Sequence, residues 1–296
     1  MRCLASRSAT WVTAVERFLH LLGYRVVLLG VLTACVPPEA DIDGGYKRIV
    51  SLAPSTTELL FAIGAGELVV GRTQWDADPP AALAVPSVGQ GLDPNVEAVA
   101  ARRPDLVILY DSPANATVQE HLERLGIATI RFSLDRLDDV ARGARLLGRL
   151  TDTERLADSL ADVFAAALDS ARRVPVPEPR PTVLILSWDQ PPIVIGGGSF
   201  QSELLELAGA VNAFADLSQP SAQVSIETVA ARNPDLILLT GDTSDPAWAR
   251  RPEWRVVPAV RDRRFAVVSG TQFSYPSFRS LAAVRELRDA MQRAGR

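Results

Sequence analysis

Short apolar runs alternate with amphipathic stretches along most of the chain. The run at residues 48–52 predicts a strand, and the segment STTE at 55–58 has the pattern of a capping box, which predicts a helix start. We expect that helix to end near Gly64 and a second strand to follow at 68–71. This alternation of strand and helix favours an α/β lobe with a mainly parallel sheet.

One pattern occurs twice. Residues 95–110 (NVEAVAARRPDLVILY) and residues 225–240 (SIETVAARNPDLILLT) each contain a glutamate, a V-A-A-R helix face, a Pro-Asp turn and an unbroken apolar run. The proline ends the helix, and the apolar run suits a strand buried on both faces. The two copies are too far apart for a solenoid repeat, so we infer that one kind of α/β lobe occurs twice.

A long helical region separates the two lobes. Helical spacing extends over 135–150, and the segment TDTE at 151–154 predicts a second capping box. The stretch 153–173 contains no proline or glycine, so it predicts a helix roughly 30 Å long, enough to bridge two lobes. Prolines at 175–179 end it, and the apolar run at 182–186 predicts the first strand of the second lobe.

The N-terminal segment has the order of features found in bacterial lipoprotein precursors. The apolar stretch 26–34 follows Arg17 and Arg25, is too short to span a bilayer, and ends at Cys35. The tetrapeptide LTAC at 32–35 resembles a lipobox, so we predict cleavage before Cys35 and acylation of its sulfur. The alternative is a buried N-terminal helix with an incidental cysteine.

These patterns predict the following organisation. The fold class is α/β, with two Rossmann-like lobes of mainly parallel sheet joined by one long backbone helix. The expected segments are a lipoprotein signal peptide at 1–34, a flexible tether at 35–46, an N-terminal lobe at 47–134, a helical linker with the backbone helix at 135–175, and a C-terminal lobe at 180–296.

Charge and composition exclude several function classes. The formal net charge is −4 and no basic patch with interleaved aromatic residues occurs, which excludes a nucleic-acid surface. After the predicted signal peptide, Cys35 is the only cysteine and His121 the only histidine. We therefore predict no disulfide, no metal site, no cofactor and no catalytic residues. A lipid-anchored enzyme is the alternative from another class.

Several segments together resemble one family. They are RIVSLAPSTTELLFAIGAG at 48–66, the Pro-Pro segment at 76–80, PNVEAVAARRPDLVIL at 94–109, GGGSFQSELLELAGAVNAFADL at 196–217 and QVSIETVAARNPDLILL at 223–239. Over roughly residues 47–290 the chain resembles the cobalamin-type periplasmic binding proteins of ABC importers, whose two lobes are joined by one rigid helix.

The resemblance implies a function and partners. It implies a monomeric, lipid-anchored protein of the periplasm or cell surface that captures cobalamin or a related corrinoid. The partner it implies is an importer permease dimer with its ATPase. In that family one acidic residue on each lobe docks onto arginines of the permease, and Glu97 and Glu227 occupy these positions. Ferric siderophore or haem binding is the alternative within the fold, and stabilisation of a helix end is the alternative role of each glutamate.

The resemblance also implies a ligand cleft between the lobes, at the ends of strands and the starts of helices. Aromatic faces there would suit a macrocycle. Two positions where relatives often carry an aromatic residue hold Gln90-Gly91 and Ile193 instead. The candidate ligand-binding residues are Ser55, Thr56, Trp75, Gln90, Gly91, Trp188, Phe200, Thr271 and Tyr275.

Overall fold

The computed structural model describes residues 44–294 except 177, 242 and 269. The predicted signal peptide, the predicted acylation site Cys35 and most of the predicted tether lie outside the described residues. Among the helices in the described part of the chain, none has both the length and the apolar character that a membrane span requires.

The first lobe is built on a four-stranded parallel sheet in the order β2-β1-β3-β4. Successive residues of these strands face opposite sides, as the two-residue period of a strand requires, so both faces are buried. The strands are β1 (Ile49–Ser51), β2 (Val69–Gly71), β3 (Leu106–Tyr110) and β4 (Ala128–Phe132), and the helices are α1 (Pro54–Ala62), α2 (Val96–Ala101) and α3 (Pro113–Arg124).

The second lobe has a six-stranded sheet in the order β10-β9-β5-β6-β8, with β7 paired to β5. Strands β5, β7, β9 and β10 pair in parallel, whereas β6 is antiparallel to both β5 and β8. The strands are β5 (Thr182–Asp189), β6 (Pro192–Ile195), β7 (Val211–Asn212), β8 (Ser221–Gln223), β9 (Leu236–Thr240) and β10 (Phe265–Val268). The helices are α6 (Phe200–Ala208), α7 (Ile226–Arg232), α8 (Pro258–Arg261) and α9 (Ala283–Ala294).

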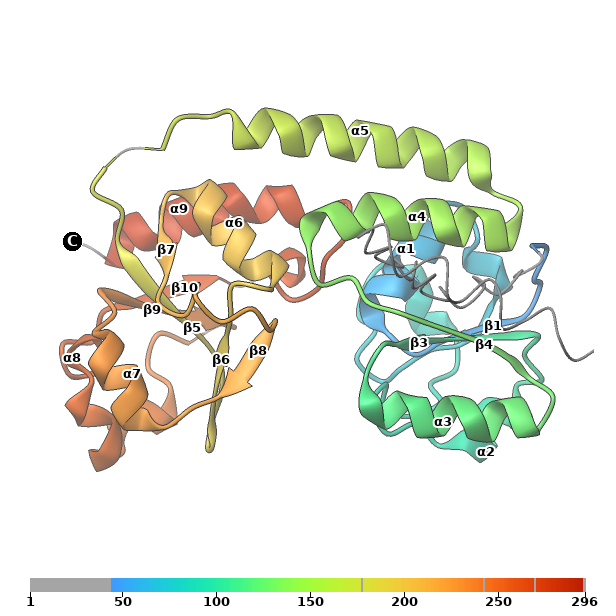
Figure 1. Ribbon diagram of the computed structural model, residues 1–296, viewed down its shortest axis with the longest axis horizontal. Helices are drawn as coiled ribbons and strands as arrows, with labels where there is room; N and C mark the ends of the chain where they lie inside the picture. Colours follow the sequence, from blue (N-terminus) through green and yellow to red (C-terminus); the bar gives the residue numbers. More distant parts are fainter. Residues whose placement is uncertain (1–43, 177, 242, 269, 295–296) are drawn as a thin grey trace, which may run out of the picture. The chain divides into compact units, whose positions relative to one another are not determined.

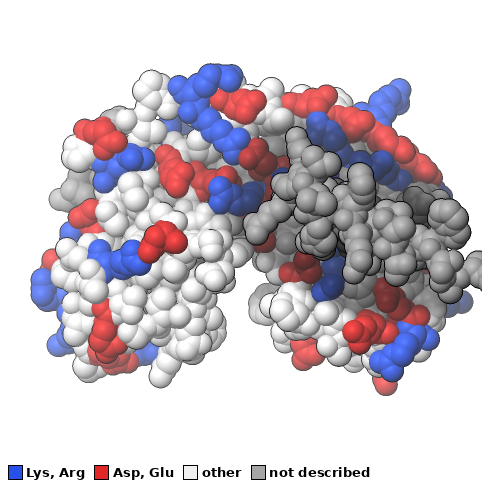
Figure 2. All heavy atoms as spheres, viewed as in Figure 1, with Lys and Arg blue, Asp and Glu red and all other residues white. Residues whose placement is uncertain are grey.

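Two antiparallel helices connect the lobes (Figure 1). They are α4 (Leu137–Thr151) and α5 (Glu154–Arg172), which confirms the two predicted helices to within two residues. At 1.5 Å per residue, the 19 residues of α5 span about 28 Å. Figure 2 shows acidic and basic side chains interspersed over the outer surface of this helix. The two lobes and the long helix confirm the predicted fold class.

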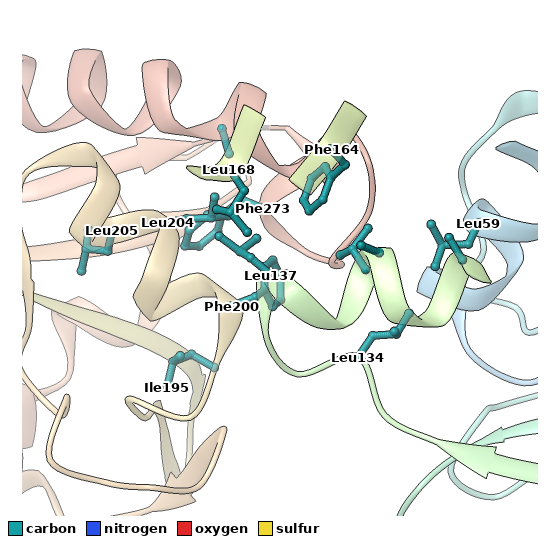
Figure 3. Close-up of a cluster of buried hydrophobic side chains, with 14 of the residues drawn as sticks. Leu59, Leu134, Leu137, Phe164, Leu168, Ile195, Phe200, Leu204, Leu205 and Phe273 are labelled. Carbon is teal, nitrogen blue, oxygen red and sulfur yellow. The ribbon is translucent and has the colours of Figure 1, made fainter. Parts of the chain in front are cut away.

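One hydrophobic core extends through both lobes on the side of α4 and α5. Figure 3 shows its central part, where Leu137 of α4 and Leu168 of α5 lie close to Leu204 of α6 and to Phe273. The opposite faces of the two sheets are covered by separate cores, one under α2 and α3 and one under α7 and α8. The shared core therefore ties the lobes together along one side only, and the other side is left for a cleft.

Both predicted capping boxes are wrong. Helix α1 begins at Pro54 with Ala53 as its cap, so Ser55 lies inside the first turn and no side chain caps this end. The carboxylate of Glu58 instead accepts two hydrogen bonds from Arg279, at 2.7 and 3.0 Å. Thr153 caps α5 without a side-chain bond, because a left-handed residue, Asp152, turns the chain directly from α4 into α5.

Candidate functional site

A cavity of about 430 Å³ lies between the two lobes. It opens where several strands end and where α1 and α6 begin, which is the usual place for a ligand in an α/β fold. Figure 2 shows the lobes separated by a hollow whose wall on the second lobe is largely free of charged side chains. The lining residues are Leu52, Ala53, Pro54, Ser55, Thr73, Trp75, Gln90, Gly91, Leu92, Tyr110, Leu134, Asp135, Ile195, Ser199, Phe200, Gln201, Pro220, Ser221, Tyr275 and Pro276.

The cavity brings together six of the nine predicted ligand residues. They come from both lobes, although up to 220 positions separate them in the sequence. Gly91 lies so close to the carbonyl oxygen of Leu52 that a β-carbon would clash with it, so a glycine is needed on this wall. The six residues are Ser55, Trp75, Gln90, Gly91, Phe200 and Tyr275.

Three predicted ligand residues lie elsewhere. Thr56 is 3% exposed within α1, and Thr271 donates a hydrogen bond to the Asp78 carboxylate at 2.6 Å. Trp188 is 59% exposed and lines a separate cavity of about 160 Å³ beside Trp248. Trp188 lies outside the cavity because β5 continues past the residues that pair with β9 into a hairpin with β6, and the tryptophan lies in that extension.

Trp75 offers the largest free aromatic surface in the cavity. It is 58% exposed, and its loop is held by a buried acid, Asp76, that accepts hydrogen bonds from Thr57 and Thr73. Burial raises the pKa of Asp76, while these hydroxyl donors act against that rise. Across the cavity, the hydroxyl of Tyr275 donates to the Trp75 carbonyl at 3.4 Å. The indole face is thus available to a ligand on a positioned loop.

Tyr110 and Asp135 form a hydrogen-bonded pair on the cavity wall, and neither was among the predicted ligand residues. The Tyr110 hydroxyl donates to the Asp135 carboxylate at 2.9 Å. Burial raises the pKa of Asp135, hydrogen bonds from Tyr110 and Ser133 act against this rise, and the charge of Asp139 adds to it. Burial, and then its bond to Asp135, also raise the pKa of Tyr110 far above its ordinary value, so the phenol stays a neutral donor.

A signal for Tyr110 was present in the sequence. It ends the first copy of the repeat, directly after an apolar strand, where a ligand-facing residue is expected. Asp135 gave no such signal, because it lies at the start of a predicted helix and reaches Tyr110 only through the pairing of β3 with β4.

An ionic cluster joins the lobes beside the cavity. Arg279 of the second lobe binds Glu58 through two hydrogen bonds and lies 3.3 Å from Asp78. The pKa of Asp78 is lowered, first by the hydrogen bond from Thr271 and then by Arg279. These contacts fix the loop that follows β10 against α1 and the Pro-Pro segment.

The two predicted docking residues are both exposed. Glu97 lies in the first turn of α2, and Glu227 in the first turn of α7. The pKa of Glu227 is lowered by hydrogen bonds from its own backbone N–H and from Ser225. A carboxylate in the first turn of a helix is also favoured by the helix dipole, a role that is compatible with docking.

No metal centre is built from the described residues. They contain no group of three or more His, Cys, Asp or Glu side chains that could hold a metal ion. His121 lies exposed on α3, outside the cavity.

Two α/β lobes joined by a long helix, with an apolar cleft between them, define a two-lobed solute-binding protein. Residues 49–270 match the family described as periplasmic binding protein, and the chain belongs to this family. It is a substrate-binding protein of the family that serves vitamin B12, haem and siderophore uptake, whose members are not enzymes.

Three similar proteins illustrate the family. A vitamin B12-binding protein of Yersinia pestis is 30% identical over 220 residues, which cover 74% of this chain and 76% of the relative. An uncharacterized ABC transporter substrate-binding lipoprotein of Bacillus subtilis is 29% identical, covering 86% of this chain and 82% of the relative. The periplasmic heme-binding protein RhuT from Roseiflexus sp. RS-1 is 26% identical with a TM-score of 0.69, covering 85% of this chain and 100% of that one.

Proposed function

We propose that this protein captures cobalamin or a related corrinoid in the cleft and delivers it to the permease dimer of an ABC importer. The observation that carries the proposal is the chemistry of the cavity wall. Four aromatic side chains, Trp75, Tyr110, Phe200 and Tyr275, line an opening whose other polar side chains are neutral apart from one acid, and no histidine or cysteine lines it.

A corrinoid suits this wall for two reasons. Its flat macrocycle offers apolar area to aromatic side chains, and its carboxamide side chains can pair with Ser55, Gln90 and Gln201. Because no histidine or cysteine lines the wall, binding would depend on surface complementarity and the metal would keep its own ligands. A corrinoid exceeds 430 Å³, so it would extend through the open mouth of the cavity.

The test is a ligand titration of the full chain extracted in mild detergent. Cyanocobalamin, cobinamide, haem and a ferric hydroxamate siderophore are titrated by calorimetry and by quenching of tryptophan fluorescence. We expect corrinoids to bind most tightly and Trp75→Ala to weaken them about ten- to a hundred-fold. Tighter binding of haem or the siderophore would replace the corrinoid with one of these alternatives.

We also propose that the protein is anchored to the membrane by acylation of Cys35. The order of charge, apolar run and lipobox supports this, as does the lipoprotein among its relatives. Mass spectrometry of membrane-extracted protein should show an acylated N-terminus at Cys35, and Cys35→Ser should release the protein from the membrane. An N-terminus at Met1 without acyl chains would contradict the anchor.

We also propose that Glu97 and Glu227 dock onto the permease. The support is their exposure and their matching positions in the two copies of the repeat, one per lobe. A permease dimer presents two equivalent surfaces, and a carrier with one carboxylate on each lobe can meet both.

A further inference from the structure

The cavity wall carries a single charged side chain. Among the lining residues, all of which the structure describes, Asp135 is the only acid, and none is a lysine, arginine or histidine. A ligand that enters the cavity therefore meets one negative group and no cation on the wall. Because charges interact strongly in partly buried surroundings, this one group can decide which ligand charges are accepted.

The arginines that neighbour the wall in sequence are engaged elsewhere. Arg136 donates to Glu203 at 2.8 Å and to the Gly197 carbonyl, and Arg131 pairs with Asp111 at 3.3 Å. Arg72 donates to the carbonyl oxygens of Ala82 and Thr73, at 2.9 and 2.7 Å. Each of these guanidinium groups already contacts a group other than Asp135.

Asp135 is held in a defined position. Its side chain accepts the Tyr110 hydroxyl at 2.9 Å, and its main-chain N–H donates to the Asp139 carboxylate at 2.9 Å. An ionised carboxylate has about four acceptor positions, so Asp135 can accept a further hydrogen bond from a ligand.

Elsewhere the wall offers hydrogen-bond donors. The first turn of α1 reaches the cavity at Ser55 and no side chain caps it, whereas at the start of α6 the N–H of Gln201 already donates to the Ser199 hydroxyl. Helix N-termini favour acceptor atoms. The cavity thus presents donors at the start of α1 and an acceptor at Asp135. A primary carboxamide satisfies both kinds of group, whereas a carboxylate can only accept.

We propose that Asp135, positioned by Tyr110, is a specificity-determining residue that selects ligands presenting an N–H donor at this corner of the cavity and rejects those presenting a carboxylate. This rests on the proposed function, in which the ligand is a corrinoid with several carboxamide side chains. Asp135 would then favour a ligand with an intact amide over one in which that amide is hydrolysed to a carboxylate.

The experiment uses corrinoids that differ only in charge. Cyanocobalamin and its three monocarboxylate isomers, each with one propionamide hydrolysed, are titrated against the full chain in detergent. At least one isomer should bind on the order of tenfold more weakly than cyanocobalamin, which is the size expected for like charges in partly buried surroundings. Asp135→Asn, which keeps an acceptor for Tyr110, should remove this difference. Asp169→Asn, an equal change in charge on the exposed face of α5, should leave it intact.

The outcomes separate this assignment from the proposed function. Equal binding of all three isomers and cyanocobalamin to the unmodified protein overturns the role of Asp135 but leaves the corrinoid function standing. A penalty that survives in Asp135→Asn also overturns it, and Asp135→Ser serves the same purpose if the asparagine variant does not fold. Failure of every corrinoid to bind the unmodified protein removes the proposed function and this assignment together.

Discussion

The two copies of the repeat fold alike up to the end of their strands. Asn95 caps α2 by accepting from the N–H of Ala98, and Ser225 caps α7 by accepting from that of Thr228. Asp105 and Asp235 both accept hydrogen bonds from main-chain N–H groups at the start of the neighbouring strand. These positions are shared because both lobes need the same cap, turn and strand pairing.

The copies differ at the last residue of the strand. Tyr110 ends β3, lines the cavity and binds Asp135, whereas Thr240 ends β9, is exposed and lines the smaller cavity beside Trp188. The two copies therefore share the residues that form the cap, the turn and the strand of each lobe, and they differ where the strand reaches a cavity. Sites in α/β folds lie at this end of the strands, where residues can change without altering the sheet.

The largest expected effect concerns the exposed glutamate that each copy carries in the first turn of its helix, Glu97 and Glu227. In Glu97→Ala/Glu227→Ala, transport should fall strongly, because each permease arginine left unpaired weakens docking about thirty-fold or more. Each single variant should retain part of the activity, since one lobe still docks. The measurement is corrinoid uptake by vesicles that contain the importer, alongside ligand titration.

Ligand affinity provides the control for this prediction. Both glutamates are exposed and neither lines the cavity, so corrinoid binding should stay unchanged in the double variant. A matched pair of exposed glutamates, Glu67→Ala/Glu154→Ala, should transport normally. Intact transport in Glu97→Ala/Glu227→Ala would end the docking assignment, and lost ligand affinity would give these residues a different role.

The second prediction concerns the repeated aspartate. Asp105 accepts from the N–H groups of Lys47 and Arg48 at 2.8 and 2.9 Å, whereas Asp235 accepts only that of Thr182 at 2.8 Å among the hydrogen bonds the structure describes. Asp105→Ala should therefore lower the free energy of unfolding by about 2 kcal/mol, and Asp235→Ala by about 1 kcal/mol. Urea denaturation measures both, and an equal or reversed order would show that the number of main-chain hydrogen bonds accepted does not determine the loss of stability.

The third prediction concerns the last strand residue of each copy, which is Tyr110 in the first and Thr240 in the second. Tyr110→Phe removes the hydrogen bond to Asp135 and should weaken cyanocobalamin binding about three- to tenfold, the usual net value of one such bond. Thr240→Val, at the matching position of the second copy, should change affinity less than about twofold. If calorimetry finds the threonine variant equally damaging, ligand recognition is not confined to the first copy.

Much of the fold could be predicted because its signals are local. The Pro-Asp turns and apolar runs located β3 and β9, and the stretch without proline or glycine located α5. The capping box at 55–58 misled because Pro54 starts the helix one residue earlier. Glu58 then binds Arg279, 221 residues away, a partner that no local pattern could indicate.

The site was predicted only in part, because some of its residues follow a local pattern and others depend on how the sheet assembles. Trp75 and Tyr275 follow strands, and the rule that ligands lie at strand ends located them. The same rule failed for Trp188, because the sequence did not show that β5 continues past its pairing with β9 into a hairpin with β6. Asp135 depends on the register that pairs Tyr110 with Phe132, which is a property of the assembled sheet.

The smallest expected effect lies in the turn that follows each repeat helix. Arg103 and Asn233 occupy matching positions and both adopt a left-handed conformation, with φ of 49° and 44°. Asparagine tolerates this region, whereas arginine is strained there by its β-carbon. Arg103→Gly should therefore raise the free energy of unfolding by about 0.5–1 kcal/mol, and Asn233→Gly should change it by less than about 0.5 kcal/mol. The contact that Arg103 makes with Arg48 uses its main-chain carbonyl, so it survives the substitution.

Arg102→Gly is the matched control: Arg102 has an ordinary helical φ of −76°, so glycine there should destabilise the protein. Urea midpoints that fall for Arg103→Gly as they do for Arg102→Gly would show that the left-handed turn carries no strain and that the two copies are equivalent here.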